Sequence, residues 1–288
     1  MTRVVAPSRL HFGLLSVPVV GQSQWPGLDG ADGLPLRHFG GLGLMLDTPG
    51  LLVRAEEADA WAAIGAHAER ALSFGQRFCA SFPPAQRKNF RLTVERAPAE
   101  HIGLGTGTQL ALAIAKALAV ELGVPTLSAS GLAARVGRGE RSAIGIHGFQ
   151  LGGLILEAGK LPGERLSPLL AHFDFPRTWR VLVISPENAA TWYGQREQQA
   201  FAQMSQHAPT TNETETLCRL ALTGLLPALV AGELDARRWA GQVRGGAGQV
   251  LGGRAGHVLG GGLGDALTAL ADLAGGTADL IAARRVVA

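Results

Sequence analysis

The amino-acid sequence predicts an α+β fold, and three observations carry that prediction. Stretches with an apolar side chain at every second position, typical of strands, occur early in the chain. Longer stretches with apolar residues at helical spacing follow, and the two kinds do not alternate in a regular βαβ order. The 288 residues are 47% hydrophobic and 17% charged, so the chain can bury a core and is not disordered.

The N-terminal part of the chain is predicted to hold four strands and one helix. Apolar side chains alternate with polar ones in the strands, as at Leu10, Phe12 and Leu14. The helix begins with acidic residues, which the positive end of a helix dipole favours, and it ends before Pro83. In chain order the predicted elements are the strands 3–15, 41–47 and 50–56, the helix 57–80 and the strand 90–96.

The region after residue 100 is predicted to be mainly helical. An apolar helix opens directly after a glycine-rich loop and stops at Gly123 and Pro125, and Ser128 or Ser130 caps the next helix. The segment Arg141–Gly153 is expected to be a glycine-studded loop that leads into a strand. In chain order the predicted elements are the helices 106–122 and 128–138, the strands 152–157 and 180–185, and the helices 194–206 and 212–231.

The C-terminal part has a different composition. Residues 236–288 hold 13 of the 40 glycines, and glycine loses more backbone entropy on folding than any other residue. Only 265–285 shows a helical pattern there. The sequence therefore predicts an N-terminal domain at 1–165, a partial second domain at 166–235 and an atypical Gly/Ala/Arg-rich tail at 236–288.

Charge and cysteine content exclude several classes of protein. The formal net charge of +3, with a single tyrosine and no basic run, argues against nucleic-acid binding. No apolar run is long enough to predict a membrane helix. Two cysteines cannot form a disulfide framework or a cysteine zinc site, and the scattered histidines show no metal-ligand spacing. We therefore expect a cytoplasmic protein with no metal site built from protein ligands.

The strongest candidate site is the loop that precedes the helix predicted at 106–122. Its sequence is Gly103-Leu104-Gly105-Thr106-Gly107-Thr108-Gln109. Glycines let backbone N–H groups approach an anion closely, a helix N-terminus adds partial positive charge, and Thr106 and Thr108 could add hydroxyl donors. The loop matches neither a Walker A loop nor a dinucleotide fingerprint. It therefore predicts a phosphate or diphosphate cradle, and the alternative is a flexible loop with a helix cap.

The other candidate residues are charged. Arg9 and His11 lie two positions apart, hence on one face of the first strand, where a cation and a titratable ring could bind an anion and move a proton. Arg37 ends a polar loop, and Arg141 and His147 belong to the glycine-studded segment. These side chains could hold phosphate or carboxylate oxygens or transfer a proton. A solvated strand face and surface arginines would explain the same residues without a site.

Several motifs together resemble the GHMP kinase superfamily, and within it the β-ribofuranosylaminobenzene 5′-phosphate synthase family. The similarity extends over about residues 1–236. The motifs that carry it are Pro7–Leu14, Gly40–Met45, Gly103–Gln109, Arg141–Gly153 and Leu225–Leu229. The resemblance implies an N-terminal half like the second domain of ribosomal protein S5 and a ferredoxin-like C-terminal half, here incomplete.

The resemblance also implies a reaction. The family condenses 5-phosphoribosyl 1-diphosphate with 4-aminobenzoate, releasing CO2 and diphosphate, in tetrahydromethanopterin biosynthesis. Gly103–Thr108 would bind the diphosphate, and Arg37 and Arg141 would bind phosphate or carboxylate oxygens. Arg9, His11 and His147 would be catalytic. Mg²⁺ would arrive bound to the substrate, and the enzyme would be a homodimer.

Two departures from the superfamily pattern bear on this reading. No acidic residue lies between Arg141 and Glu157, where many GHMP kinases place a catalytic Asp, which argues against an ATP-dependent kinase. The family's C-terminal Gly-Gln-Ser-Ser-Trp-Gly-Pro-like motif is absent. A reading-frame change near codon 236 would explain both this loss and the unusual tail. A small-molecule kinase and a non-catalytic remnant with a damaged C-terminus therefore remain as alternatives.

Overall fold

The computed structural model describes residues 1–14, 37–100, 102–161, 163–177, 180–184, 211–232 and 280–284. The chain divides into two compact units. Unit 1 comprises residues 1–12 and 39–172, and unit 2 comprises residues 13–38 and 173–288. The helix predicted at 194–206 and most of the atypical tail lie outside the described residues.

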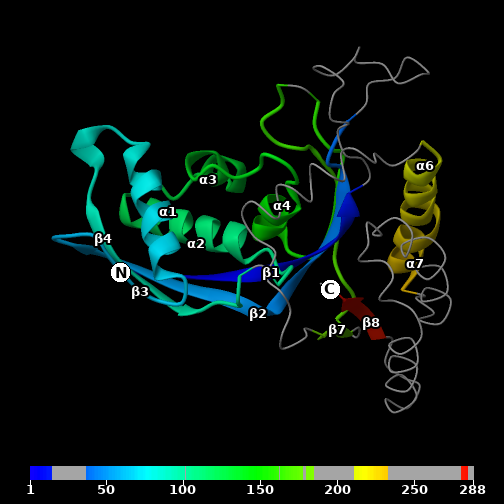
Figure 1. Ribbon diagram of the computed structural model, residues 1–288, viewed down its shortest axis with the longest axis horizontal. Helices are drawn as coiled ribbons and strands as arrows, with labels where there is room; N and C mark the ends of the chain where they lie inside the picture. The colour runs from blue at the N-terminus through cyan, green and yellow to red at the C-terminus, as the bar shows by residue number, and fades with distance from the viewer. Residues whose placement is uncertain are drawn as a thin grey trace. The chain divides into compact units, whose positions relative to one another are not determined.

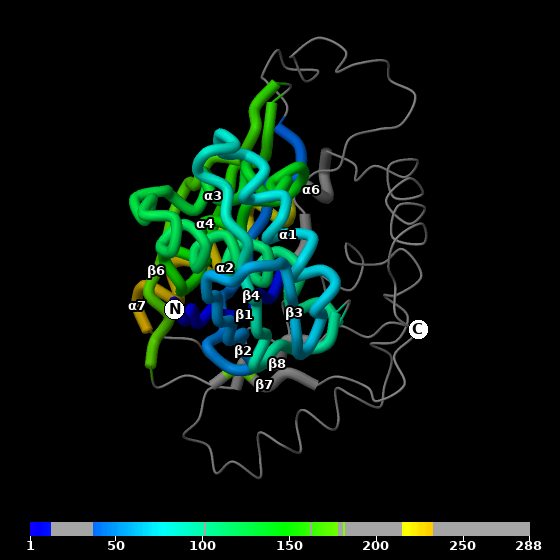
Figure 2. Tube along the Cα trace, turned by 90° about the vertical axis from the view of Figure 1, so that its left-hand side faces the viewer, coloured from blue at the N-terminus to red at the C-terminus, as the bar shows by residue number. Residues whose placement is uncertain are grey.

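A mixed six-stranded sheet forms the base of unit 1. Its strands are β1 (Thr2–Leu14), β2 (Gly41–Ala58), β3 (Ala62–Gly65), β4 (Asn89–Arg96), β5 (Leu154–Glu157) and β6 (Leu169–Phe173). The order is β3-β4-β2-β5-β6, and β1 pairs with β2. Strand β2 runs antiparallel to both β4 and β5, whereas β3 runs parallel to β4. Figure 2 shows β1, β2, β3 and β4 next to one another.

Four helices gather over one face of this sheet (Figure 1). They are α1 (Ala68–Ala80), α2 (Thr106–Glu121), α3 (Ala129–Arg135) and α4 (Ile144–Leu151), and a 3₁₀ turn η1 (Pro84–Gln86) follows α1. Helix α2 begins and ends within a residue of its predicted bounds. Helix α3 starts at the predicted cap, where the Gly131 N–H donates to the Ser128 hydroxyl at 3.2 Å.

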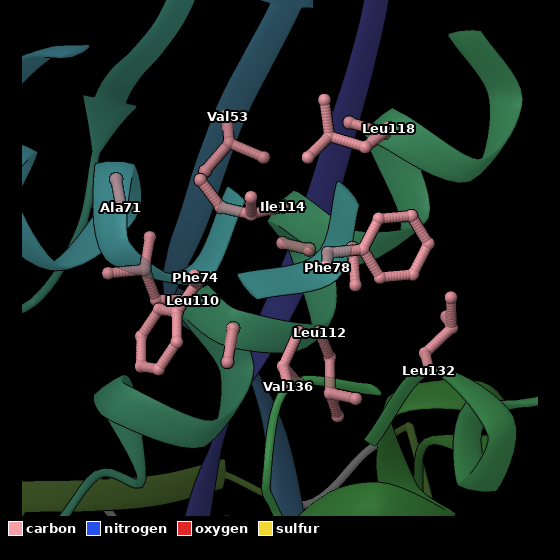
Figure 3. Close-up of a cluster of buried hydrophobic side chains, with 14 of the residues drawn as sticks. Val53, Ala71, Phe74, Phe78, Leu110, Leu112, Ile114, Leu118, Leu132 and Val136 are labelled. Atoms are coloured by element: carbon pink, nitrogen blue, oxygen red, sulfur yellow. The ribbon is translucent and has the colours of Figure 1, made fainter. Parts of the chain in front are cut away.

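Helix α2 is the centre of the hydrophobic core because it is apolar on all sides. A helix of that kind is stable only when other elements surround it. Figure 3 shows its side chains packed among those of α1, of β2 and of the α3 region. The fully buried members from α2 include Leu110, Leu112, Ile114 and Leu118.

The structure corrects the predicted break in β2 and the predicted start of the first helix. The turn expected between the strands 41–47 and 50–56 does not end the strand, because β2 continues to Ala58. Its acidic end pairs with β4, where Glu56 lies opposite Arg91 in the antiparallel register. Glu57 forms a salt bridge with Lys88 at 2.7 Å. Cross-strand pairing therefore outweighs the helix-start signal of these acids. Strand β3 follows, and α1 begins only at Ala68.

The segment expected to be a glycine-studded loop contains helix α4. Glycine disfavours helices, and α4 contains Gly145 and Gly148. Both glycines are needed for close packing. A Cβ at Gly145 would lie 3.1 Å from Gln109 Nε2 of α2, and a Cβ at Gly148 would overlap the Met45 side chain of β2. The tertiary contacts of α4 therefore outweigh its weak helix propensity.

The described part of unit 2 contains helices and one strand pair. Helices α6 (Thr211–Leu220) and α7 (Leu226–Ala231) are joined by a π-helical turn η2 (Ala221–Leu225), so the helix predicted at 212–231 is present with one irregular turn. Strands β7 (Arg180–Ile184) and β8 (Leu280–Arg284) pair in parallel. The helix predicted at 265–285 is wrong for residues 280–284, which form the strand β8. Their backbone groups pair with those of β7. Within the described ranges, no helix is both long and apolar enough to cross a membrane.

Truncation of a core residue of α2 tests this account of the fold. Ile114 is 1% exposed, and Ile114→Ala should lower the free energy of unfolding by about 2–5 kcal/mol, because it leaves a cavity. Val120 of the same helix is 41% exposed, so Val120→Ala should change it by about 0.5 kcal/mol or less. Urea unfolding followed by circular dichroism measures both values. Equal losses in the two variants would contradict the central position of α2.

Candidate active site

The glycine loop before α2 is held against the first strand. Gly103 and Gly105 both have positive φ angles, 87° and 68°, which side chains rarely tolerate. Between them, the Leu104 carbonyl accepts a hydrogen bond from the Arg9 backbone N–H at 2.8 Å. The loop therefore has a fixed backbone shape and a fixed position beside β1.

The first turn of α2 leaves backbone donors without an acceptor inside the helix. The N–H groups of Thr108 and Gln109 both donate to the Gly105 carbonyl at 3.1 Å. The N–H groups of Thr106 and Gly107 lie at the start of the helix, so no earlier helical carbonyl can accept from them. Together with the helix dipole, these N–H groups form an environment suited to a phosphate or diphosphate.

The two threonines of the loop differ in what their side chains can do. The Thr106 hydroxyl donates to the Ala99 carbonyl at 3.1 Å, and Thr106 is only 3% exposed. It closes the loop and is not a donor directed at a ligand, which differs from the expectation for this residue. Thr108 is half-buried, so its hydroxyl remains a candidate donor.

Two guanidinium groups flank the loop. A Cβ placed on Gly105 would lie 3.1 Å from Arg9 Nε, and a Cβ placed on Gly107 would lie 2.9 Å from an Arg70 terminal nitrogen. Arg70 comes from α1, and its other terminal nitrogen forms an ion pair with Glu100 at 2.6 Å. No local sequence signal could reveal Arg70 as part of the site, because only the packing of α1 against α2 brings it there.

A third arginine adds to the positive charge beside the loop. Burial lowers the pKa of Arg138, the neighbouring charge of Arg70 lowers it further, and the charges of Glu100 and Glu140 partly oppose that shift. Both guanidinium groups lie over the Phe74 ring, with Arg138 at 4.8 Å and Arg70 at 5.6 Å from the ring centroid. A bound anion would offset this repulsion, so the charge distribution agrees with the backbone geometry.

Helix α4 meets the loop at its first turn. The Gln109 side-chain amide donates to the Gly145 carbonyl at 2.7 Å, and both residues are buried. At the same turn, a Cβ on Gly145 would be 3.5 Å from Arg9 Cδ. The structure therefore brings together Arg9, the glycine loop and the start of the segment that contains Arg141 and His147.

The two candidate histidines face different partners. His147 Nε2 donates to the Ser167 carbonyl at 2.8 Å, because a carbonyl oxygen can only accept. Two residues after Gly145, it lies on a different side of α4 from the contact with the loop. His11 Nε2 lies 3.1 Å from the Ser142 hydroxyl, which can either donate or accept. The contact with Ser142 does not by itself fix the tautomer of His11, whereas the bond to the Ser167 carbonyl places the proton of neutral His147 on Nε2.

A buried acid lies next to these groups. Glu157 ends β5, is 0% exposed, and accepts a hydrogen bond from the Ala143 N–H at 2.6 Å. Burial raises the pKa of Glu157, while Ser142, Ala143, Ser167 and the charge of Arg9 partly oppose that shift. The sequence marks Glu157 only as the end of an acid-free segment, and no motif points to it.

The remaining predicted residues are not brought to the loop by the geometry of unit 1. Arg141 is exposed, one position before Ser142. Arg37 belongs to unit 2 and is half-buried. Their roles stay predictions.

Other parts of unit 1 offer less chemistry. A shallow pocket of about 380 Å³ lies between β1, Asp47 and the C-terminal half of α4. Among its lining residues, Asp47 is the charged one, and none of the predicted site residues is included. Within the described part of the chain, no group of three or more His, Cys, Asp or Glu side chains is placed to hold a metal ion.

Comparisons with known proteins identify relatives of one kind. The chain is 32% identical over 253 residues to a Methanothermobacter thermautotrophicus protein named beta-ribofuranosylphenol 5'-phosphate synthase, covering 80% of this chain and 71% of that protein. An Archaeoglobus fulgidus protein of the same name is 30% identical over 250 residues, covering 82% and 72%. No family model matches the chain.

A solved structure shows the fold. The phosphomevalonate kinase of Streptococcus pneumoniae matches with a TM-score of 0.55 and 14% identity, covering 87% of this chain and 79% of that one. At this identity the match concerns the fold alone. It confirms the predicted α+β, GHMP-kinase-like fold.

Substitution of a loop glycine tests the anion cradle. Gly105→Ala places a Cβ 3.1 Å from Arg9 Nε at a φ of 68°, so it should displace Arg9 and weaken diphosphate binding about tenfold or more, about 1.4 kcal/mol. Gly123→Ala is the matched control, because Gly123 has a φ of 72° and nothing within 4 Å of its Cβ position. Isothermal titration calorimetry with inorganic diphosphate measures both affinities. Equal affinities would exclude the cradle.

The buried acid predicts a pH dependence of stability. Burial raises the pKa of Glu157 above 4.5 in the folded state. Its favourable contribution to the free energy of unfolding is therefore full below pH 4.5 and is lost as the pH rises through the folded pKa. The stability of Glu157→Gln relative to the unchanged protein should therefore increase over that range. Urea unfolding from below pH 4.5 to neutral pH measures the difference.

Glu121 provides a control of opposite sign. Burial acts to raise its pKa, but the Thr2 hydroxyl and the N-terminal ammonium together lower it below 4.5. The contribution of Glu121 is therefore present above pH 4.5 and is lost as the pH falls through the folded pKa. Glu121→Gln should lose stability relative to the unchanged protein as the pH rises. The same trend in both variants would contradict the assignment.

Proposed function

This chain belongs to the beta-ribofuranosylphenol 5'-phosphate synthase family, and on that premise we propose that it transfers a phosphoribosyl group to an aromatic acid with loss of CO2. The observation that carries the proposal is the match to synthases over about four fifths of the chain. The geometry of unit 1 supports it, because a glycine loop flanked by Arg9 and Arg70 suits a diphosphate.

The two substrates follow from the product named for the relatives. We propose 5-phosphoribosyl 1-diphosphate as the donor. A phenol as the product implies 4-hydroxybenzoate as the acceptor, whereas the motifs of the sequence resemble a family that uses 4-aminobenzoate. Both acids carry an electron-donating group opposite the carboxylate, so the same chemistry serves either of them.

The proposed reaction forms one carbon–carbon bond. The ring carbon that bears the carboxylate attacks C1 of the ribose, and the bond from C1 to the diphosphate oxygen breaks with its electron pair leaving on diphosphate. The bond from the ring to the carboxylate then breaks, CO2 departs, and its electron pair restores the aromatic ring. No oxidant or reductant is required.

The loop would act where negative charge develops. Backbone donors at Thr106 and Gly107 and the guanidinium groups of Arg9 and Arg70 would stabilise the departing diphosphate, because donors fixed in advance need no reorganisation. Arg37 and Arg141 are proposed for the 5-phosphate and the benzoate carboxylate, as the resemblance implies.

Of the two histidines, we propose His11 as the group that moves a proton. It would accept the proton of the acceptor's hydroxyl or amino group while positive charge builds on the ring, and return it as CO2 leaves. The Nε2 of His147 already donates to the Ser167 carbonyl. His147 is therefore proposed to position the segment after α4.

The remaining expectations concern the ion, the assembly and the compartment. Glu100, three positions before Gly103, is paired with Arg70, and we propose that Mg²⁺ would be held by the oxygens of the donor substrate. We expect a homodimer that works in tetrahydromethanopterin biosynthesis. A reducing, cytoplasmic compartment agrees with the two free cysteines, Cys79 and Cys218.

A kinase is the second candidate because the fold is that of a kinase. Helix α4, the segment in which many GHMP kinases carry a catalytic Asp, contains no acidic residue. The carboxyl group of Glu157 is buried and accepts the Ala143 N–H. A base for an acceptor hydroxyl is therefore missing from the kinase position.

Release of labelled CO2 tests the proposal. The full chain, shown to be folded by circular dichroism, is mixed with Mg²⁺, 5-phosphoribosyl 1-diphosphate and carboxyl-labelled 4-hydroxybenzoate or 4-aminobenzoate. We expect CO2 and diphosphate in equal amounts, and only when the phosphoribosyl donor is present. ADP formation from ATP with a hydroxyl acceptor, without CO2, would indicate the kinase. A folded chain with neither activity would indicate the non-catalytic remnant, and aggregation would point to a damaged C-terminus.

A further inference from the structure

The residue before helix α1, His67, departs in two ways from what its position favours. Its φ angle is 56°, in the left-handed region that residues other than glycine rarely adopt. It occupies the N-cap position of α1, yet its side chain makes no hydrogen bond to the first turn of that helix. An N-cap side chain ordinarily satisfies a backbone N–H there. A strained residue that does not cap its helix costs stability, which points to another role for the imidazole.

The imidazole of His67 is bonded to the segment that leads into the glycine loop. Its Nε2 lies 2.9 Å from the Pro98 carbonyl oxygen, and because a carbonyl oxygen can only accept, Nε2 donates. Pro98 follows the end of β4 and precedes Gly103 of the loop. The bond therefore joins the start of α1 to the residues that bring the chain to the loop.

Two further contacts hold this segment, residues 98–100, which we call the stem. The Ala99 carbonyl accepts a hydrogen bond from the Thr106 hydroxyl at 3.1 Å, which ties the stem to the start of α2. The Glu100 carboxylate forms an ion pair with Arg70 of α1 at 2.6 Å. Each of the three stem residues is thus tied to the start of α1 or of α2.

His67 and Arg70 hold the stem together. They are three positions apart at the start of α1, so their side chains are neighbours on its surface. One terminal nitrogen of Arg70 pairs with Glu100, and the other lies 2.9 Å from where a Cβ on Gly107 would be. A stem that stays in place against α1 therefore keeps the Arg70 guanidinium beside the loop.

We propose that His67 is a positioning residue that keeps the stem, Arg70 and the glycine loop in the arrangement that binds a diphosphate. The inference rests on the proposed function, in which the loop and Arg70 receive the departing diphosphate. The bond from His67 holds one end of the stem, and the ion pair with Arg70 holds the other. Without the bond, the donors of the loop and of Arg70 lose part of their preorganisation.

Three substitutions of His67 separate this role from a purely structural one. His67→Ala removes the bond and keeps the strain at a φ of 56°, whereas His67→Gly removes the bond and relieves the strain. In urea unfolding, the alanine variant should therefore be the less stable of the two. Both should bind inorganic diphosphate about threefold to tenfold more weakly than the unchanged chain, the effect of one lost hydrogen bond. His67→Gln places an amide donor near the position of Nε2 and should restore most of the affinity.

A control and a double-mutant cycle accompany these variants, with isothermal titration calorimetry of the full chain as the measurement. Ser128→Ala removes the cap of α3, so it should lower stability and leave the affinity for diphosphate unchanged. In an Arg70→Ala background, His67→Gly should weaken binding by less than about twofold, because the two side chains act on the same stem.

The outcomes distinguish this proposal from the proposed function. If His67→Gly binds diphosphate as tightly as the unchanged chain, or weakens binding as much without Arg70 as with it, the role of His67 is refuted. A chain that binds no diphosphate would overturn the proposal together with the assignment of the loop. Diphosphate binding that depends on His67, without release of CO2, would refute the synthase reaction and leave the role of His67 standing.

Discussion

The contact between α2 and α4 is the constraint on which the candidate site depends. The Gln109 amide donates to the Gly145 carbonyl at 2.7 Å in a buried position, and a Cβ at residue 145 would lie 3.1 Å from Gln109 Nε2. This contact sets the start of α4 against the glycine loop and beside Arg9. A side chain at 145 would therefore crowd Gln109, and it would also contact Arg9 and Thr108 at 3.5 Å.

Charge is arranged unevenly around this contact. Arg9 and Arg70 flank the loop, Arg138 lies with Arg70 over the Phe74 ring, and Arg70 forms an ion pair with Glu100. The carboxyl group of Glu157 is fully buried and accepts the Ala143 N–H just before the first turn of α4. A site with its cations at the helix N-terminus and its acid withdrawn from solvent suits an anionic leaving group better than the activation of an acceptor hydroxyl.

The fold and the chemistry are therefore separable in this protein. The chain shares its α+β architecture with a phosphomevalonate kinase, yet its relatives at about 30% identity are synthases. The short helix that contacts the loop, α4, contains His147 and Gly148 and no acidic residue in this chain.

The sequence by itself determined the elements whose signals are local. The apolar run 106–122, the alternation in β4 and the Ser128 cap all appear as predicted, and the glycine loop was identified because its glycines precede a helix. Tertiary structure decided the rest. Pairing with β4 kept Glu56 and Glu57 in a strand, and packing against Met45 and Gln109 made a helix of a glycine-rich segment. It also placed Arg70 and Glu157 near the loop and α4, because contacts between distant segments leave no pattern in the local sequence.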